Sequence, residues 1–236
     1  MDIGIQISSF RPLMRDAAGL GDVLRHMRAM GCVHTQLQWI DKSVPVPVIA
    51  DLLRQYGIQA WGAQDKSPEV FGEEEYYLAL CAATGGGDLC LSGIPNGDAQ
   101  AFAKRLEALR ERAQALEIGL SFHPVKADLA GAAQSLLQLC PWLRLTPDVC
   151  QLRDAGLDPA SFIAAYPGRV QIVHFKDRAK DGSLCPVGSG ETDFAKALEA
   201  SRISGAELIL AEQEMWQDAY QELSEGYRFL EKLTCA

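Results

Sequence analysis

Four side chains that can bind a metal or transfer a proton stand at the ends of predicted strands. They are His123, Asp148, His174 and Glu212. Histidine nitrogens and carboxylate oxygens together suit a divalent cation such as Mn, Zn, Fe or Co, and such a mixed set selects no single metal. Each residue alone also has a structural explanation, because a carboxylate after a strand can cap the next helix and His174 can be a hydrogen-bonded core histidine. Their recurrence on four consecutive strands favours a metal site.

The spacing of apolar runs predicts strands that can bring these side chains together. Short apolar runs alternate with longer amphipathic ones, and strand starts recur about every 25 to 38 residues, the length of one βα unit. The predicted strands are 3–9, 33–39, 58–63, 89–94, 119–123, 143–148, 170–176 and 208–214. The predicted helices are 21–30, 47–56, 73–83, 99–116, 130–139, 159–166, 194–203 and 217–233.

Eight strands alternating with eight helices can close as a barrel or open as a doubly wound sheet. A doubly wound dinucleotide fold would have a glycine-rich turn after the first strand, but here Ser8-Ser9-Phe10-Arg11-Pro12 follows. Asp98, Asp158 and Asp193 stand where helices should start and can cap them. We therefore predict an α/β fold, a (β/α)8 TIM barrel formed by residues 1–236 as one domain. In such a barrel the working surface is the C-terminal end of the strands.

Composition limits the partners and the compartment. The net charge of the 236 residues is -9, which disfavours nucleic acid as a partner. No run resembles a signal peptide or a membrane span, so no membrane association is expected. The seven cysteines form no CxxC pair, which favours reduced thiols in a cytoplasmic protein. A homodimer is one possible assembly.

Several segments make the chain resemble the xylose-isomerase-like TIM barrel superfamily, which includes sugar phosphate isomerases and epimerases, inosose dehydratase-type enzymes and endonuclease IV. The resemblance extends over essentially the whole chain and is most specific from about residue 143 onward. The segments are Ile3-Gly-Ile-Gln-Ile, Thr146-Pro-Asp-Val, Asp154-Ala-Gly-Leu-Asp-Pro159, His174-Phe-Lys-Asp177, Pro186-Val-Gly-Ser-Gly-Glu-Thr-Asp-Phe194 and Ala211-Glu-Gln-Glu214.

The resemblance implies one divalent metal ion (Mn, Zn, Co, Fe or Mg) held by a Glu, an Asp, a His and a Glu on strands 5 to 8. Asp148, His174 and Glu212 match the last three positions. At the first, relatives often carry a His-Asn-His-x-x-Glu-Phe type sequence, whereas this chain has His123-Pro-Val-Lys-Ala-Asp128-Leu. Asp128, His123 or a water could complete the site. The trinuclear zinc site of endonuclease IV cannot be built, because its extra histidines are missing.

Other residues near the strand ends are candidates for substrate contact. Lys176 and Arg178 can hold a sugar hydroxyl or phosphate, or can pair with Asp177 and Asp181. Trp39 and Trp61 can stack on a sugar or pack under a loop. Gly188-Ser-Gly190 can bind phosphate, although a structural turn is favoured.

The resemblance implies a metal-dependent isomerase or epimerase acting on a small sugar, keto-sugar or polyol through an ene-diolate. Glu212 is the expected base, and His123 could serve as its partner on the opposite face. Glu214 is expected to border the last helix instead. A dehydratase of the inosose type needs only one base and is an alternative. A sugar-binding barrel that has lost turnover is another, favoured by the departure on strand 5.

Overall fold

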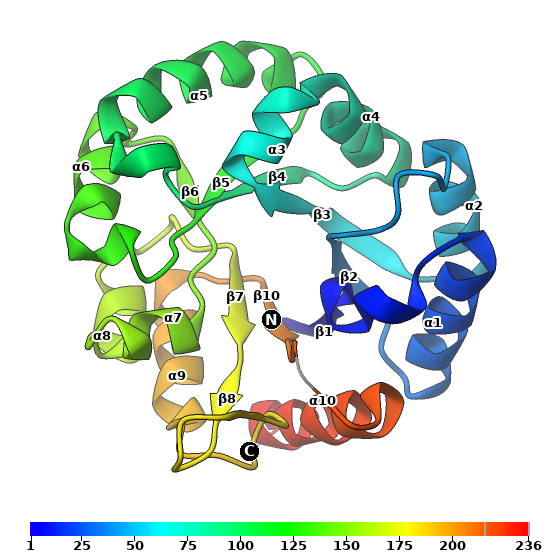
Figure 1. Ribbon diagram of the computed structural model, residues 1–236. Helices are drawn as coiled ribbons and strands as arrows, with labels where there is room; N and C mark the ends of the chain where they lie inside the picture. The colour runs from blue at the N-terminus through cyan, green and yellow to red at the C-terminus, as the bar shows by residue number, and fades with distance from the viewer. Residues whose placement is uncertain (215, 236) are drawn as a thin grey trace.

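The computed structural model describes residues 1–214 and 216–235, and its centre is a ring of parallel strands (Figure 1). Eight strands pair in the order β6-β5-β4-β3-β2-β1-β10-β7. Parallel bridges Leu145↔Val170 and Asp148↔His174 join the two end strands, so the barrel is nearly closed. The ring strands are β1 (Asp2–Gln6), β2 (His34–Leu37), β3 (Gln59–Lys66), β4 (Asp88–Ser92), β5 (Gly119–His123), β6 (Arg144–Leu145), β7 (Ile172–Phe175) and β10 (Leu208–Ala211). The predicted (β/α)8 barrel is confirmed.

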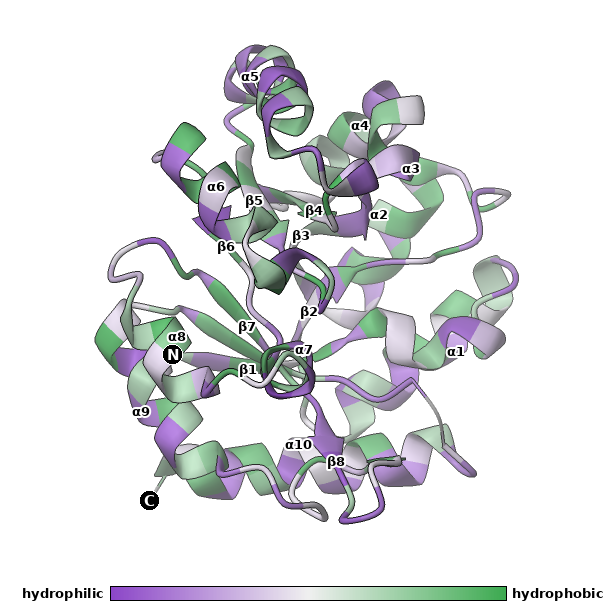
Figure 2. Cartoon of the chain, turned by 60° about the vertical axis from the view of Figure 1, so that its left-hand side comes forward, coloured by the Kyte–Doolittle hydropathy of each residue, from purple (hydrophilic) through white to green (hydrophobic). Residues whose placement is uncertain are grey.

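Helices surround the ring and cover its outer face (Figure 1). Figure 2 shows apolar and polar residues interleaved along them, as expected for helices with one face on the barrel and one in solvent. The α-helices are α1 (Ala17–Ala29), α2 (Val46–Tyr56), α3 (Ser67–Gly72), α4 (Glu74–Thr84), α5 (Ala99–Gln114), α6 (Ala132–Leu139), α7 (Val149–Asp154), α8 (Pro159–Ala164), α9 (Phe194–Ser204) and α10 (Ala219–Cys235). The 3-10 helices are η1 (Ile7–Leu13), η2 (Pro95–Gly97) and η3 (Asp128–Ala130).

The predicted caps stand at the helix starts. The side chains of Asp98, Asp158 and Asp193 accept hydrogen bonds from backbone amides in the first turns of α5, α8 and α9. Gly57 ends α2 with φ 62°, a left-handed conformation that glycine adopts without steric cost. Local chemistry therefore fixes where these helices begin and end.

Several elements differ from the sequence prediction. The first strand ends at Gln6 and turns into η1, where strand was expected to continue to residue 9. β6 has only two residues, since Pro147 offers no backbone N–H and Asp148 already caps the short helix α7. After β7 the chain forms a hairpin of β8 (Asp177–Arg178) and β9 (Leu184–Cys185). Helices α3 and α7, with six residues each, are too short to show a clear hydrophobic period.

Trp61 was predicted to end the third strand, and this is wrong. Because β3 runs from Gln59 to Lys66, Trp61 lies near its start and packs against the buried Ile172, Leu208 and Leu210. Ile172 and Leu208 begin their own strands and pair with each other. Trp61 therefore belongs to the N-terminal end of the barrel.

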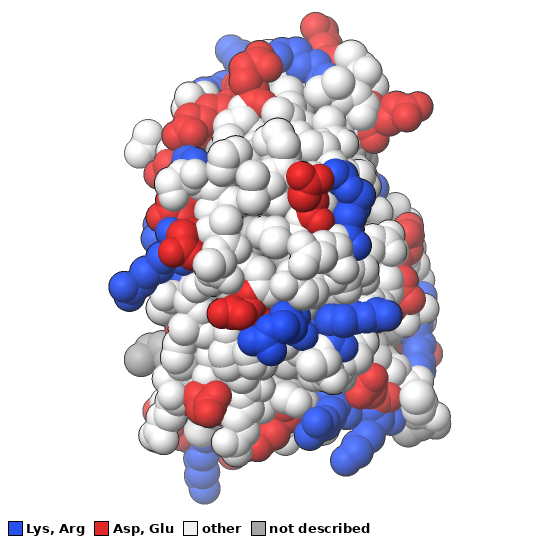
Figure 3. Space-filling view, turned by 90° about the vertical axis from the view of Figure 1, so that its right-hand side faces the viewer, with Lys and Arg blue, Asp and Glu red and all other residues white. Residues whose placement is uncertain are grey.

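Surface and thiol properties agree with the composition. On the face drawn in Figure 3, acidic and basic residues are interspersed, and neither sign covers the face. All seven cysteines are free of disulfide bonds, and five of them are buried. In the part of the chain that the structure describes, no helix combines the length and the apolar character needed to cross a membrane.

Candidate metal centre

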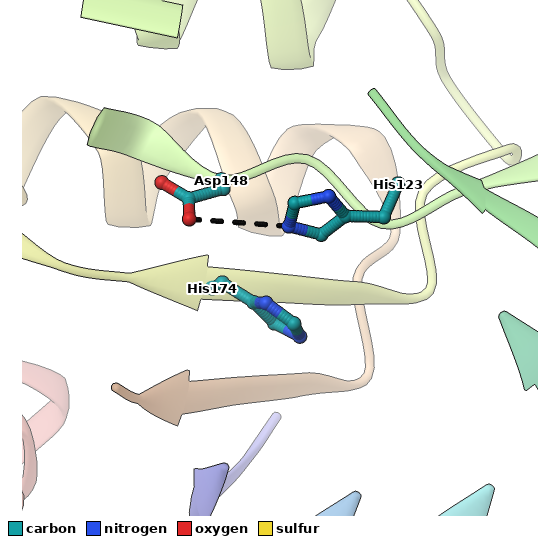
Figure 4. Close-up of side chains that lie close together, drawn as sticks. All are labelled: His123, Asp148 and His174. Carbon is teal, nitrogen blue, oxygen red and sulfur yellow. Dashed lines mark ion pairs between the residues drawn. The ribbon is translucent and has the colours of Figure 1, made fainter. Parts of the chain in front are cut away.

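Three predicted ligands meet at the C-terminal end of the strands. His123 ends β5, Asp148 follows β6, and His174 lies in β7. Each is buried and offers one ligand atom, and these atoms all lie within 4.8 Å of one another. Figure 4 shows the Asp148 carboxylate and the two imidazole rings drawn together from three neighbouring segments. Parallel pairing produces this arrangement, because it aligns the ends of successive strands at one rim.

The two oxygens of the Asp148 carboxylate have different surroundings. Its Oδ1 accepts hydrogen bonds from the backbone amides of Cys150 (2.7 Å) and Gln151 (3.0 Å), which caps α7. Its Oδ2 lies 3.9 Å from His123 Nε2 and 3.2 Å from Lys176 Nζ. The capping explanation and the metal explanation are therefore compatible, since the cap fixes the carboxylate so that its second oxygen faces the cluster.

Glu212 joins the cluster from β10. It directly follows Ala211, and its Oε2 lies 2.9 Å from His174 Nδ1. These two atoms contact each other as an ion pair, and Asp148 Oδ2 lies 3.2 Å from Lys176 Nζ. Buried carboxylate oxygens and imidazole nitrogens facing one space are ligand types that a divalent cation accepts, so the residues present fit a metal.

The donor set also agrees with the expected kind of ion. His123 and His174 supply nitrogen, and Asp148 and Glu212 supply oxygen. Mixed nitrogen and oxygen ligands suit Mn, Zn, Fe or Co better than Ca, which prefers oxygen alone.

Lys176 lies inside the same cluster and is almost fully buried. Its Nζ is 3.2 Å from Asp148 Oδ2, 3.0 Å from Glu212 Oε1 and 2.8 Å from Glu214 Oε1. The alternative in which Lys176 pairs with Asp177 or Asp181 is therefore not what the structure shows. Glu214, which was expected to border the last helix, forms an ion pair with this ammonium. A cation already balances the carboxylates.

These charges set the pKa values of the cluster. Burial disfavours the ammonium of Lys176, but Glu212, Asp148 and Glu214 outweigh it and raise its pKa well above the usual range. Burial likewise opposes ionisation of Glu212, yet Lys176 and His174 lower its pKa. Burial, and then the neighbouring His174, lower the pKa of His123 to about 4. At neutral pH His123 is therefore a neutral ring that can offer a lone pair.

Asp128, the other candidate ligand on strand 5, is directed elsewhere. Its carboxylate accepts hydrogen bonds from the backbone amides of Ile94 (3.1 Å) and Val125 (2.9 Å). Both oxygens are thus committed to holding two loops together, and the structure does not bring Asp128 into the cluster. His123 is the strand 5 residue that lies there.

Arg178 and the glycine loop have structural partners. The Arg178 guanidinium makes two hydrogen bonds to Asp154 (2.6 and 3.1 Å) and one to the carbonyl of Gly182. The amides of Gly188 and Gly190 both donate to Asp177 Oδ2 at 3.0 and 2.8 Å. The glycine loop therefore forms a structural turn held by the Asp177 carboxylate, which agrees with the interpretation favoured from the sequence.

Trp39 lines a cleft on the other side of the mouth. The cleft measures about 570 Å³ and is formed by loops after β1, β2 and β3. Trp39 has a left-handed backbone (φ 56°), and its Nε1 donates to the buried Asp65 at 3.1 Å. The Arg11 guanidinium lies 4.8 Å from the centre of its ring. None of the four cluster residues lines this cleft.

Sequence reasoning assigned no role to a group of buried glutamines. They are Gln6, Gln36, Gln38 and Gln64, on or directly after β1, β2 and β3. Gln36 contacts the cluster directly, since its Oε1 lies 2.9 Å from His174 Nε2. Polar residues at inward positions of otherwise apolar strands are the signal that could have revealed them.

No family model matches the chain, and no curated protein sequence does either. Solved structures do match. A sugar phosphate isomerase/epimerase from Parabacteroides distasonis is 14% identical with a TM-score of 0.80, over 97% of this chain and 95% of that one. A D-allulose 3-epimerase from Methylomonas sp. is 16% identical with a TM-score of 0.74, over 99% and 98%. The probable 3-DHS dehydratase from Bacillus anthracis is 12% identical with a TM-score of 0.74, over 98% and 99%.

At these identities the likeness is one of fold. The chain is built like sugar phosphate isomerase/epimerase and xylose isomerase-like TIM barrel structures along nearly its full length. The resemblance expected from the sequence motifs is therefore confirmed at the level of architecture.

Proposed function

We propose that this protein is a divalent-metal-dependent isomerase or epimerase acting on a small sugar, keto-sugar or polyol. The convergence of His123, Asp148, His174 and Glu212 at the strand ends carries the proposal. The solved structures of similar fold include proteins named as sugar isomerases or epimerases, which supports the same chemistry.

In this proposal the four side chains would hold the metal, with Lys176 moving away from Asp148 and Glu212. A bound divalent ion acts as a Lewis acid and stabilises negative charge on substrate oxygens. Glu212 removes the proton next to the carbonyl and returns it at the neighbouring carbon. The Lys176 ammonium, kept close by Glu214, donates a hydrogen bond to a substrate oxygen. Trp39 lines the cleft on the other side of the mouth, where it would contact the rest of the substrate.

A dehydratase is the second candidate, favoured by the residue at the end of β5. Relatives often have a Glu where this chain has Asp128, and the Asp128 carboxylate binds two loop amides, so Glu212 has no carboxylate partner from strand 5. Inversion at carbon needs two groups on opposite faces, whereas dehydration and aldose–ketose isomerisation can proceed with one base. Neutral His123 is the only strand 5 residue in the described cluster that could serve as the second group.

The test begins with the metal. Protein purified without chelator is analysed for Mn, Fe, Co and Zn, and the chelated protein is titrated with each ion by calorimetry. Asp148→Ala should lose most of the affinity, because it removes a ligand. Asp128→Ala is the matched control and should keep it. No binding of any divalent ion by the wild-type protein would refute the proposal.

The reaction is then tested on aldoses, ketoses and cyclic keto-polyols in deuterated water. Deuterium in a recovered sugar indicates isomerisation or epimerisation, and loss of water indicates the dehydratase. A metal-loaded protein that binds sugars but exchanges no proton would instead be a binding barrel without turnover.

A further inference from the structure

A chain of hydrogen bonds supports His174 from the β1–β2 side of the barrel. Gln6 and Gln36 are paired neighbours on parallel strands β1 and β2, and both side chains are fully buried. Gln6 Nε2 donates to Gln36 Oε1 at 2.8 Å, and the same oxygen lies 2.9 Å from His174 Nε2. One amide oxygen therefore links both side chains.

This contact bears on where the imidazole proton is. An amide oxygen can only accept hydrogen bonds, so the contact is a hydrogen bond when the ring nitrogen facing it carries the hydrogen. In a neutral ring with its hydrogen on Nε2, the other nitrogen, Nδ1, presents a lone pair, and Nδ1 lies 2.9 Å from Glu212 Oε2. A nitrogen lone pair beside a carboxylate oxygen suits two ligands of one cation.

We propose that Gln36 is a positioning residue that holds His174 in the tautomer able to bind a metal through Nδ1, and that Gln6 fixes the direction of the Gln36 amide. The inference rests on the proposed metal-dependent function and deepens it. Rotating the Gln36 amide alone would bring its NH2 group against the NH2 group of Gln6, so the two amides must turn together or not at all. A partner that fixes the second nitrogen of a ligand histidine typically changes metal affinity by about 10- to 100-fold.

The first experiment reads the tautomer directly in metal-free protein. The chain has four histidines, and long-range ¹H–¹⁵N correlation spectra of ¹⁵N-histidine-labelled protein in chelator report which nitrogen of each ring carries the proton. A His174→Asn variant assigns the signal. We expect His174 to be protonated on Nε2 in the wild-type protein and in Gln36→Glu, which keeps an acceptor oxygen. Gln36→Met and Gln6→Met should shift the proton partly or fully to Nδ1.

The second experiment measures metal affinity by calorimetry. Gln36→Met should weaken binding by about 10- to 100-fold, and Gln36→Glu should not. Gln64→Met is the matched control, because Gln64 is an equally buried glutamine on the neighbouring strand β3 with its own unpartnered Oε1. It should leave both the tautomer and the affinity unchanged. If Gln36→Met does not fold, Gln6→Met, which leaves the amide oxygen in place but frees it to rotate, tests the same point.

A His174 ring protonated on Nδ1 in the wild-type protein would overturn the inference, as would unchanged affinity in a folded Gln36→Met. The failure of the proposed function has a different signature. In that case the wild-type protein would bind no divalent ion, while the metal-free spectra would still show whether Gln36 sets the tautomer.

Discussion

Replacing Lys176 with methionine should lower the free energy of unfolding of the metal-free protein and raise its affinity for metal. The ammonium lies 3.2 Å from an Asp148 oxygen and 3.0 Å from a Glu212 oxygen. At an effective dielectric constant of about 20, each contact contributes about 5 kcal/mol of Coulomb attraction, much of it offset by desolvation of the buried charge. Removing one partner of a buried ion pair typically costs about 3–5 kcal/mol, and we expect that loss for Lys176→Met in chelator.

A bound divalent cation would neutralise the same carboxylates and displace the ammonium, so the loss should be much smaller when metal is present. The difference between the stability losses without and with metal must appear as a gain in metal affinity. Since about 1.4 kcal/mol corresponds to a tenfold change in affinity, Lys176→Met should bind metal at least tenfold more tightly than the wild-type protein.

Urea unfolding with and without metal, together with calorimetric titration, measures both quantities. Lys42→Met is the control, because Lys42 pairs with Glu73 at the exposed surface, where such a pair contributes at most about 1 kcal/mol. Metal affinity equal to that of the wild-type protein would refute the idea that Lys176 and the metal compete for one space.

Four further outcomes are expected. Glu212→Gln should lower turnover by about 100-fold or more at full metal content, which is the scale of general base catalysis. Glu214→Gln should keep most of the wild-type turnover. Equal turnover in Glu212→Gln and wild-type protein would place the base elsewhere, and His123 would be the first residue to test. Asp128→Ala should lower the free energy of unfolding by about 1–3 kcal/mol, because it leaves two backbone amides without an acceptor. Because burial and His174 lower the pKa of His123 to about 4 from 6.5, the unfolded chain binds more protons between these pH values, and stability should fall by up to roughly 3 kcal/mol as the pH drops through them. Urea titrations of His123→Gln at several pH values should lack that part of the slope. Thiol titration should find about seven free groups in denatured, unreduced protein, and two or more disulfides would contradict the reduced state. Native protein should react first at Cys235, because its thiol is exposed.

The order of elements was readable from the sequence because each βα unit repeats the same local chemistry. Asp98, Asp158 and Asp193 signalled helix starts through short side chains that accept amide hydrogen bonds. Apolar runs marked the strands to within a few residues. The hairpin β8–β9 and the short helices α3 and α7 were not predicted, because segments of six residues or fewer show no clear hydrophobic period.

Part of the candidate site could also be predicted from the sequence. Asp148, His174 and Glu212 could be named together because parallel strands bring their C-terminal ends to one rim, whatever the details of packing. His123 and Asp128 could not be separated, since five residues of loop after β5 allow either carboxylate or ring to turn inward. Trp61 was misplaced because β3 continues to Lys66, five residues beyond the tryptophan, so that Trp61 lies near the start of the strand and not at its end.

The sequence by itself determined the type of barrel, the rim where the candidate site lies, and the presence of Asp148, His174 and Glu212 at that rim. Those features follow from period and from strand direction, which are local properties. The tertiary structure decided that His123 joins them, that Asp128 binds two loop amides, that Lys176 lies between the carboxylates and that Gln36 contacts His174. Each of these depends on which residues, up to 138 positions apart in the chain, share one buried space and must satisfy one another's charges and hydrogen bonds there.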